Sequence, residues 1–265
     1  MTELNYSVNR NGSTYSLGEA TRKLVNNFVK APIDVVVYET NPDEISNIKI
    51  TLFKNDETLI LEDGKDYVVK KVSDKGEWYK YEYTIYDTNF ADDGTYRISI
   101  YSEDKAGNIA ENNLDVKDVE ISFGIDKTLP NLIVTNLESK ATYPVDKLSV
   151  LMRATDNMKL QSITVELDGT VIASWDEEQI QQMSNDLQDF VFEIKGDETT
   201  AHSVTITLTD IAGNQRIETI SDFYVTTNLW IRFINNKVLF YGSIVACLTM
   251  GLVFVLLLMR KRRHQ

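Results

Sequence analysis

The chain has 265 residues, with 40 acidic and 27 basic side chains and a formal net charge of −13. A chain this acidic does not attract nucleic acid by its overall charge, so we exclude that class of function. Its single cysteine, Cys247, leaves the rest of the chain without disulfides, thiolate nucleophiles or cysteine metal ligands. Among exported β-proteins, this lack of disulfides is more typical of bacterial than of animal surfaces.

Residues 1–30 lack the basic and apolar regions of a signal peptide. The stretch 4–16 is expected to be a loop or edge segment, and the spacing of Leu17, Leu24 and Phe28 predicts a short amphipathic helix after it. We interpret 1–30 as a partial N-terminal segment and expect the chain to be the C-terminal part of a longer protein. A mis-set start codon and an uncut, tail-anchored protein facing the cytosol are the alternatives.

An internal repeat divides most of the remaining chain into two units. Residues 98–108 match residues 204–214 at a constant offset of 106, and both segments run from an alternating strand into a D-x-A-G-N turn. Pro32 and Pro130 each precede an apolar run, and they are 98 residues apart. A period near 100 residues predicts two tandem domains, over residues 31–126 and 127–226.

Both units consist of short runs rich in Val, Ile, Tyr and Thr, separated by Asn, Asp, Gly and Ser, which is typical of strands joined by turns. About six or seven such strands per hundred residues indicate an antiparallel β-sandwich. The expected fold class is all-β: two tandem Ig-like antiparallel β-sandwiches followed by a single C-terminal transmembrane α-helix. A polar stretch at 176–185 predicts a helical crossover. The predicted strands are residues 34–39, 48–53, 67–72, 78–86, 95–102, 119–125, 149–154, 161–167, 171–175, 190–194, 204–209 and 216–223.

Residues 92–98 (DDGTYRI) have the spacing D-x-G-x-Y-x-C of the tyrosine corner in immunoglobulin-type domains, with Ile98 in place of the cysteine. In such a corner the tyrosine hydroxyl bonds to the backbone of the corner loop, so Tyr96 is expected to have a structural role. The second unit has His202 at the equivalent position, and the corner is not repeated there.

The two D-x-A-G-N turns and the connector at residues 124–130 (GIDKTLP) resemble the bacterial Ig-like repeats of Gram-positive cell-surface proteins. The likeness covers residues 32–226. It implies a surface location and a stalk or adhesive role, and it brings no catalytic residues, so we expect no enzyme. In the connector, Pro130 restricts Leu129 to extended conformations and limits interdomain swing.

Residues 238–259 contain no charged side chain and, at about 1.5 Å rise per residue, would form a helix of roughly 33 Å, enough to cross a bilayer. No sortase-type signal, L-P-x-T-G, precedes this span. The basic tail at 260–265 predicts a cytoplasmic C-terminus and an extracellular N-terminal part. Residues 227–237 form a juxtamembrane segment, and the bilayer is the expected partner. The expected anchor residues are Trp230, Arg260, Lys261, Arg262 and Arg263.

Calcium is the one metal that the residue types suggest, because carboxylate and amide oxygens are the ligands it prefers. Calcium takes about six to eight oxygens, and neither D-x-A-G-N turn offers more than two or three. The favoured interpretation is structural: Gly107 and Gly213 supply positive φ, and the Asp and Asn side chains close the hairpins. We therefore expect no cofactor, with calcium as the alternative. The weak calcium candidates are Asp92, Asp93, Asp104, Asn108, Asp210 and Asn214.

Other residues could suggest catalysis or sugar binding. The acidic run at 176–178 lies in a polar stretch, without the facing carboxyls and apolar pocket that a glycosidase needs. His202 is the only histidine outside the tail, which excludes a multi-histidine centre. The aromatic strand at 78–83 could stack on a sugar, although half of its side chains must fill the core.

The favoured function is a non-catalytic, membrane-anchored bacterial surface protein whose Ig-like domains act as a membrane-proximal stalk or adhesive module. The alternatives are the C-terminal anchor region of a larger cell-envelope enzyme, or a module that binds a host or cell-envelope protein or a glycan.

Overall fold

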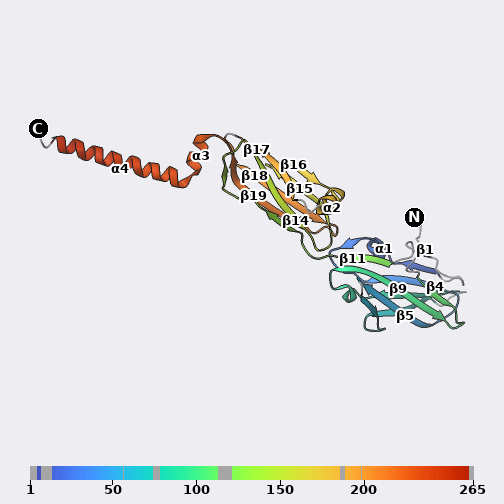
Figure 1. Ribbon diagram of the computed structural model, residues 1–265. Helices are drawn as coiled ribbons and strands as arrows, with labels where there is room; N and C mark the ends of the chain where they lie inside the picture. The colour runs from blue at the N-terminus through green and yellow to red at the C-terminus, as the bar shows by residue number, and fades with distance from the viewer. Residues whose placement is uncertain are drawn as a thin grey trace. The chain divides into compact units, whose positions relative to one another are not determined.

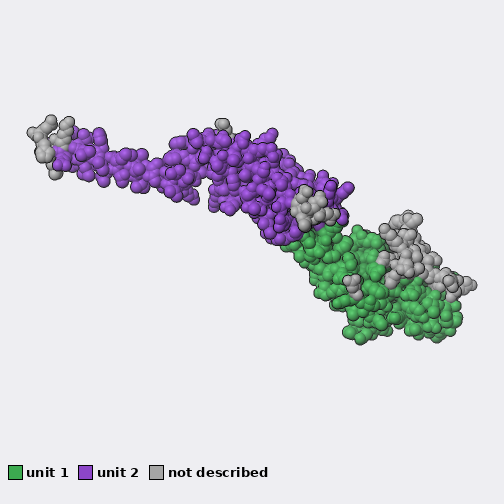
Figure 2. Space-filling view, viewed as in Figure 1, with its two compact units in different colours: residues 1–130, 156–159, 209–215 green, residues 131–155, 160–208, 216–265 purple. Residues whose placement is uncertain are grey.

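The structure is a computed structural model that describes residues 5–6, 14–55, 57–73, 78–112, 121–185, 189–197 and 199–262. The chain consists mainly of β-strands and ends in one long helix (Figure 1), so the expected all-β architecture with a C-terminal apolar helix is confirmed. It divides into two compact units (Figure 2). Unit 1 comprises residues 1–130, 156–159 and 209–215, and unit 2 comprises residues 131–155, 160–208 and 216–265.

Unit 1 contains two sheets. The strand order is β1-β2-β4-β8-β7 in one sheet and β3-β11-β9-β5-β6 in the other, where β10 also pairs with β9. Neighbouring strands pair antiparallel, except that β3 and β11 are parallel. The elements are β1 Asn5–Tyr6, β2 Thr14–Leu17, α1 Glu19–Leu24, β3 Phe28–Val29, β4 Val35–Asn41, β5 Ile45–Lys54, β6 Glu57–Ile60, β7 Tyr67–Ser73, β8 Tyr79–Ile85, a 3-10 turn at Asp87–Phe90, β9 Gly94–Asp104, β10 Ile109–Glu111 and β11 Ile121–Ile125.

One apolar core lies in unit 1, and both sheets contribute to it. Burial alternates residue by residue along β4, where Val35 and Val37 are fully buried, as the period of two in the sequence predicts. Ile98 and Ile100 enter the same core from β9 of the other sheet. The inward faces of the two sheets therefore share one hydrophobic interior.

Residues 14–29, within the predicted partial N-terminal segment 1–30, contribute directly to unit 1. β2 pairs with β4, β3 pairs with β11, and Leu17 is buried in the core. The predicted helix is short: it ends at Leu24, because Val25 has extended backbone (ψ 133°) and Asn26 has a positive φ of 62°. Phe28 consequently lies in a strand and not on the helix face.

Unit 2 also contains two sheets, with strand orders β12-β14-β17 and β13-β19-β18-β15-β16. Burial alternates along the whole of β18, so its inward side chains join a core separate from that of unit 1. The elements are β12 Asn131–Val134, β13 Thr142–Tyr143, β14 Lys147–Thr155, β15 Leu160–Leu167, β16 Thr170–Trp175, α2 Glu177–Asn185, β17 Phe190–Lys195, β18 His202–Asp210, β19 Gln215–Val225, α3 Leu229–Asn235 and α4 Lys237–Arg262.

The helix α2 occupies the polar stretch where a crossover was expected. Asp176 begins it with a capping box: its carboxylate accepts from Gln179 N at 2.9 Å, and its own N–H donates to Gln179 Oε1 at 3.0 Å. The acidic run at 176–178 is therefore the start of a helix.

Two helices follow the last strand. Asn228 caps α3, because its Oδ1 accepts from Trp230 N at 2.9 Å and from Ile231 N at 3.3 Å. Within α4, the span Lys237–Arg260 has 24 residues, and its most apolar window has a mean hydropathy of 2.5 and no buried residue, so the helix is long and apolar enough to cross a membrane.

The predicted anchor residues lie on these two helices. Trp230 is 65% exposed on α3, with its ring centroid 5.7 Å from that of Phe233. Arg260, Lys261 and Arg262 end α4. Arg263 lies outside the described residues.

Candidate metal centre

The two D-x-A-G-N turns have the same internal hydrogen bonds. In the first, Asp104 accepts from Asn108 N at 2.8 Å and from Asn108 Nδ2 at 2.9 Å. In the second, Asp210 accepts from Asn214 N and from Asn214 Nδ2, both at 2.8 Å. The glycines that follow the alanines have φ values of 84° and 83°. Both turns therefore close their hairpins with their own side chains, which is the structural role expected of them.

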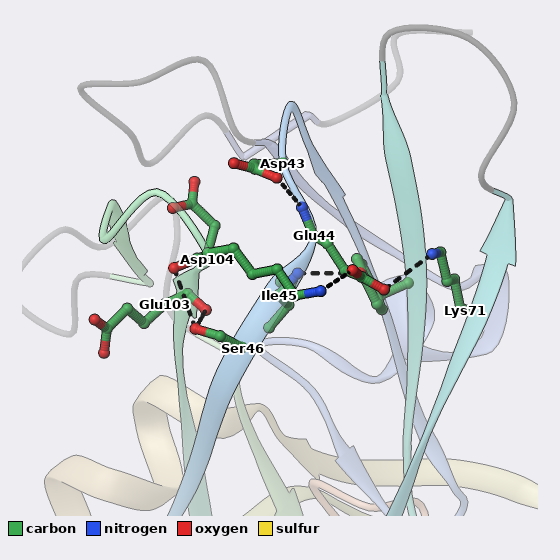
Figure 3. Close-up of polar contacts among 9 residues, drawn as sticks. Asp43, Glu44, Ile45, Ser46, Lys71, Glu103 and Asp104 are labelled. Atoms are coloured by element: carbon green, nitrogen blue, oxygen red, sulfur yellow. Dashed lines mark hydrogen bonds and ion pairs between the residues drawn. The ribbon is translucent and has the colours of Figure 1, made fainter.

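The first turn is surrounded by ion pairs. Glu44 lies beside it and pairs with Lys71 at 3.2 Å and with Lys105. Figure 3 shows Ser46 donating to the main-chain carbonyls of Glu103 and Asp104, at 3.0 and 3.1 Å. Lys105, and then Lys71, lower the pKa of the partly exposed Glu44 carboxyl. The acid beside this turn is thus already neutralised by two lysines.

The second turn has different surroundings. Asp210 lies with Asp126 and Asp156 in unit 1, where one carboxylate oxygen from each falls within 4.8 Å of the others. Asp126 and Asp210 are both 0% exposed, and Asp156 is partly buried. Three carboxylates from distant points in the chain therefore lie close together in a largely buried site.

The backbone holds this cluster in position but leaves part of it unsatisfied. Asp126 Oδ1 accepts from Thr128 N at 3.1 Å, and Asp156 Oδ2 accepts from Met158 N and Lys159 N, both at 3.0 Å. Asp126 Oδ2 and Asp156 Oδ1 are buried and have no hydrogen-bond partner among the described residues. Burying a carboxylate oxygen without a hydrogen-bond partner costs free energy. A proton or a cation bound to each of these two oxygens would remove that cost.

Electrostatics within the cluster point the same way. Burial, the largest cause, raises the pKa of Asp126, and the negative charges of Asp156, Asp210 and Asp93 raise it further, against the lowering effect of the Thr128 N–H. A divalent cation would reverse this repulsion, because it interacts favourably with every carboxylate it touches. Calcium fits best, since it binds only oxygen ligands at about 2.3–2.6 Å and tolerates irregular geometry.

The other two acidic candidates have different roles. Asp92 pairs with Lys54 at 2.6 Å. Asp93 accepts from Lys127 N at 3.0 Å, from Thr128 Oγ1 at 2.6 Å and from Asn157 Nδ2 at 3.2 Å. These bonds lower the pKa of Asp93 although burial alone would raise it. Asp93 therefore supports the segments that carry the cluster and is not itself among its three carboxylates.

Asp126 and Asp156 are the two carboxylates of the cluster that sequence reasoning missed. Asp126 lies in the GIDKTLP connector, which was noted only as a domain boundary, and Asp156 lies in a short loop with no motif. The connector supplied a weak signal, since Asp126 directly follows Ile125, the last apolar residue of a predicted strand. Nothing in the sequence links Asp156 to either of the other carboxylates.

The remaining candidates have structural roles. The Tyr96 hydroxyl donates to Asp92 O at 2.7 Å, which is the bond expected of the tyrosine corner. His202 Nδ1 lies 2.7 Å from Asp168 Oδ2, and the His202 ring lies 5.9 Å from that of Phe223. Pro130 is buried beside the exposed Leu129.

The aromatic strand does not present a sugar-stacking face. Tyr81 and Tyr83 point into the core of unit 1, and Trp78, which is 44% exposed, precedes β8. Tyr83 donates to the buried Glu39 at 2.5 Å. Half of the strand fills the core, as the alternation of its side chains requires.

No protein-family model and no curated protein matches the chain. Solved structures give partial likenesses. The fibronectin(III)-like modules of Clostridium thermocellum CbhA are 16% identical, over 80% of this chain and 94% of that one, with a TM-score of 0.35. The ectodomain of mouse nectin-like molecule 4 is 10% identical, over 82% and 65%, with a TM-score of 0.35. A 1.5-MDa bacterial ice-binding adhesin is 13% identical, over 84% and 67%, with a TM-score of 0.32.

Proposed function

We propose that this chain is a non-catalytic, membrane-anchored bacterial surface protein. Units 1 and 2 act as Ig-like sandwiches in a membrane-proximal stalk or adhesive module, and α4 is the permanent anchor. The observation that carries the proposal is α4 itself, an unburied apolar helix that follows two β-sheet units. An exposed helix of this composition is stable in lipid but not in water.

The orientation follows from charge. The basic residues at the end of α4 remain on the cytoplasmic side, which puts both units outside the cell. The aromatic rings at the other end suit the outer interface: Phe240 lies 5.8 Å from Phe233 and 5.6 Å from Tyr241, between centroids.

Protease treatment of intact cells tests the orientation. Peptides from units 1 and 2 should be released into the medium, while the basic C-terminal peptide should be cut only after lysis. If peptides from the two units were released only after lysis, the proposed topology would be excluded. A cytosolic marker protein, which must stay uncut until lysis, controls for cell integrity.

We further propose that calcium binds to Asp126, Asp156 and Asp210. The unpartnered, buried Oδ2 of Asp126 supports this assignment most directly. A bound ion would hold the loop at 156–159 and the turn at 209–215 against the segment that contains Asp126. Calcium would thus stiffen unit 1 at the place where these three chain segments meet.

A matched pair of variants tests the calcium site. Asp210→Asn and Asp104→Asn remove the same charge from two turns with the same internal bonds, and only Asp210 belongs to the cluster. Calcium at about 100 times its dissociation constant should stabilise the wild type by about 2.7 kcal/mol. Calcium should also stabilise Asp104→Asn but not Asp210→Asn. Equal responses to calcium in both variants would refute the assignment.

A further inference from the structure

A cavity of about 480 Å³ lies within unit 2, where α3 meets the first turn of α4. Its walls come from residues 140–144, from α3 and from the start of α4. Leu229, Phe233 and Leu239 form much of its apolar surface. The cavity therefore opens beside the residues with which the apolar span begins.

Its polar lining has an excess of donors. Lys140 and Arg232 line the cavity, both are exposed, and neither forms an ion pair with any residue that the structure describes. None of the described residues that line the cavity is acidic. The Asn235 Nδ2 atom, on the same wall, is buried and has no hydrogen-bond partner in the described part of the chain. The two cations of the lining thus have no acidic partner among the described residues, on a chain whose net charge is −13.

We propose that this cavity binds the phosphate of an anionic glycerophospholipid headgroup. A phosphate supplies what the lining lacks: negative charge and oxygen acceptors for the guanidinium of Arg232 and the ammonium of Lys140. The N-terminus of α4, a helix of 26 residues, adds partial positive charge on the same side.

The position and the apolar walls favour a lipid over free phosphate. The inference rests on the anchoring proposed above, which puts the first turn of α4 at headgroup depth. Leu229 is 76% exposed and Leu239 is 58% exposed, so both offer apolar surface beside the donors. A lipid would cover that surface with its glycerol and upper acyl chain, and inorganic phosphate would leave it in water.

The test uses the full chain reconstituted in vesicles of equal phosphatidylglycerol and phosphatidylcholine. The protein is released in mild detergent, and the lipids that remain bound are counted by mass spectrometry. Phosphatidylglycerol should be enriched over phosphatidylcholine, by about fivefold for each cation that contacts the headgroup. Lys140→Glu and Arg232→Glu should each reduce the enrichment by at least that factor, because each removes one attraction and adds a repulsion. Lys195→Glu is the matched control, because Lys195 is also exposed on unit 2 and does not line the cavity.

The outcomes separate the two proposals. If the chain does not float with vesicles, the anchoring itself fails. If it floats but retains both lipids equally, or if Lys195→Glu acts as strongly as Arg232→Glu, the headgroup site is overturned while the anchoring stands. If millimolar inorganic phosphate displaces the retained phosphatidylglycerol completely, the ligand is free phosphate, and the assignment to a lipid is overturned.

Discussion

The side-chain amide of Asn214 donates to the main-chain carbonyl of Asp126 at 2.9 Å, so the second D-x-A-G-N turn is bonded directly to the segment that carries a candidate metal ligand. The same amide also donates to Asp210 Oδ2 at 2.8 Å. Among the described residues, the equivalent amide of Asn108 bonds only to Asp104, within its own turn. Two turns with the same sequence pattern therefore differ in what they hold together.

This difference predicts unequal effects of the same substitution. Asn214→Ala should lower the free energy of unfolding by about 1 kcal/mol more than Asn108→Ala, because one further hydrogen bond is lost. Denaturant unfolding of the full chain in detergent, without calcium, measures the difference. Equal losses would mean that the bond from Asn214 to Asp126 contributes nothing net.

The carboxylate cluster predicts a pH dependence whose sign calcium reverses. The pKa of Asp126 is raised in the folded state, so without calcium its contribution is most favourable at acid pH, and stability falls as the pH rises through that pKa. Bound calcium needs the ionised carboxylates, so its stabilisation is present at neutral pH and is lost in acid as protons compete for the same oxygens.

The melting temperature, Tm, measured against pH with and without calcium checks this prediction. The buried Glu39 also has a raised pKa, mainly through burial, and contributes the same sign without calcium. Acids with a lowered pKa, such as Glu44 and Asp93, contribute the opposite sign. The difference between the wild type and Asp126→Asn therefore isolates the cluster: without calcium the variant should lose the share of stability that Asp126 contributes at acid pH, and the calcium-dependent difference should be abolished. An unchanged difference in Asp126→Asn would contradict the prediction.

The strands could be predicted where one face is buried. Along β4 and β18 the alternation of apolar and polar side chains reports the sheet directly, and both strands lie within a few residues of the predicted ranges. β6 could not be found in this way, because all four of its side chains are exposed and no alternation results. β13 has only two residues, too few to show a period.

The candidate site was less accessible from the sequence than the fold. Asp210 was noted for its turn, but its importance depends on Asp126 and Asp156, which are 84 and 54 residues away in the numbering. Tertiary structure alone brings such residues together. The burial that leaves their oxygens without partners is likewise invisible in local composition.

Removing the hydroxyl of the tyrosine corner is expected to lower the stability of the protein. Tyr96→Phe removes the hydroxyl that donates to Asp92 O and keeps the ring, which lies 5.6 Å from that of Phe123. The free energy of unfolding should fall by about 0.5–1.5 kcal/mol. Tyr101→Phe, on the same strand, is the control, because its hydroxyl bonds to no described residue, and it should be nearly neutral. Equal effects in urea titrations would contradict a specific role for the corner bond.

A side chain at Gly124 is expected to clash with Phe28, and removing the Phe28 ring should relieve the clash. Gly124 lies opposite Phe28 in the parallel pair of β11 and β3, and a Cβ at Gly124 would meet the Phe28 ring at 2.1 Å. Gly124→Ala should therefore cost about 1–3 kcal/mol, because the ring must move off its place on the sheet. In a Phe28→Ala background the same change should cost much less. A double-mutant cycle of unfolding free energies measures this coupling. If Gly124→Ala cost the same with and without the Phe28 ring, the close approach of β3 to β11 would not be the reason for glycine at this position.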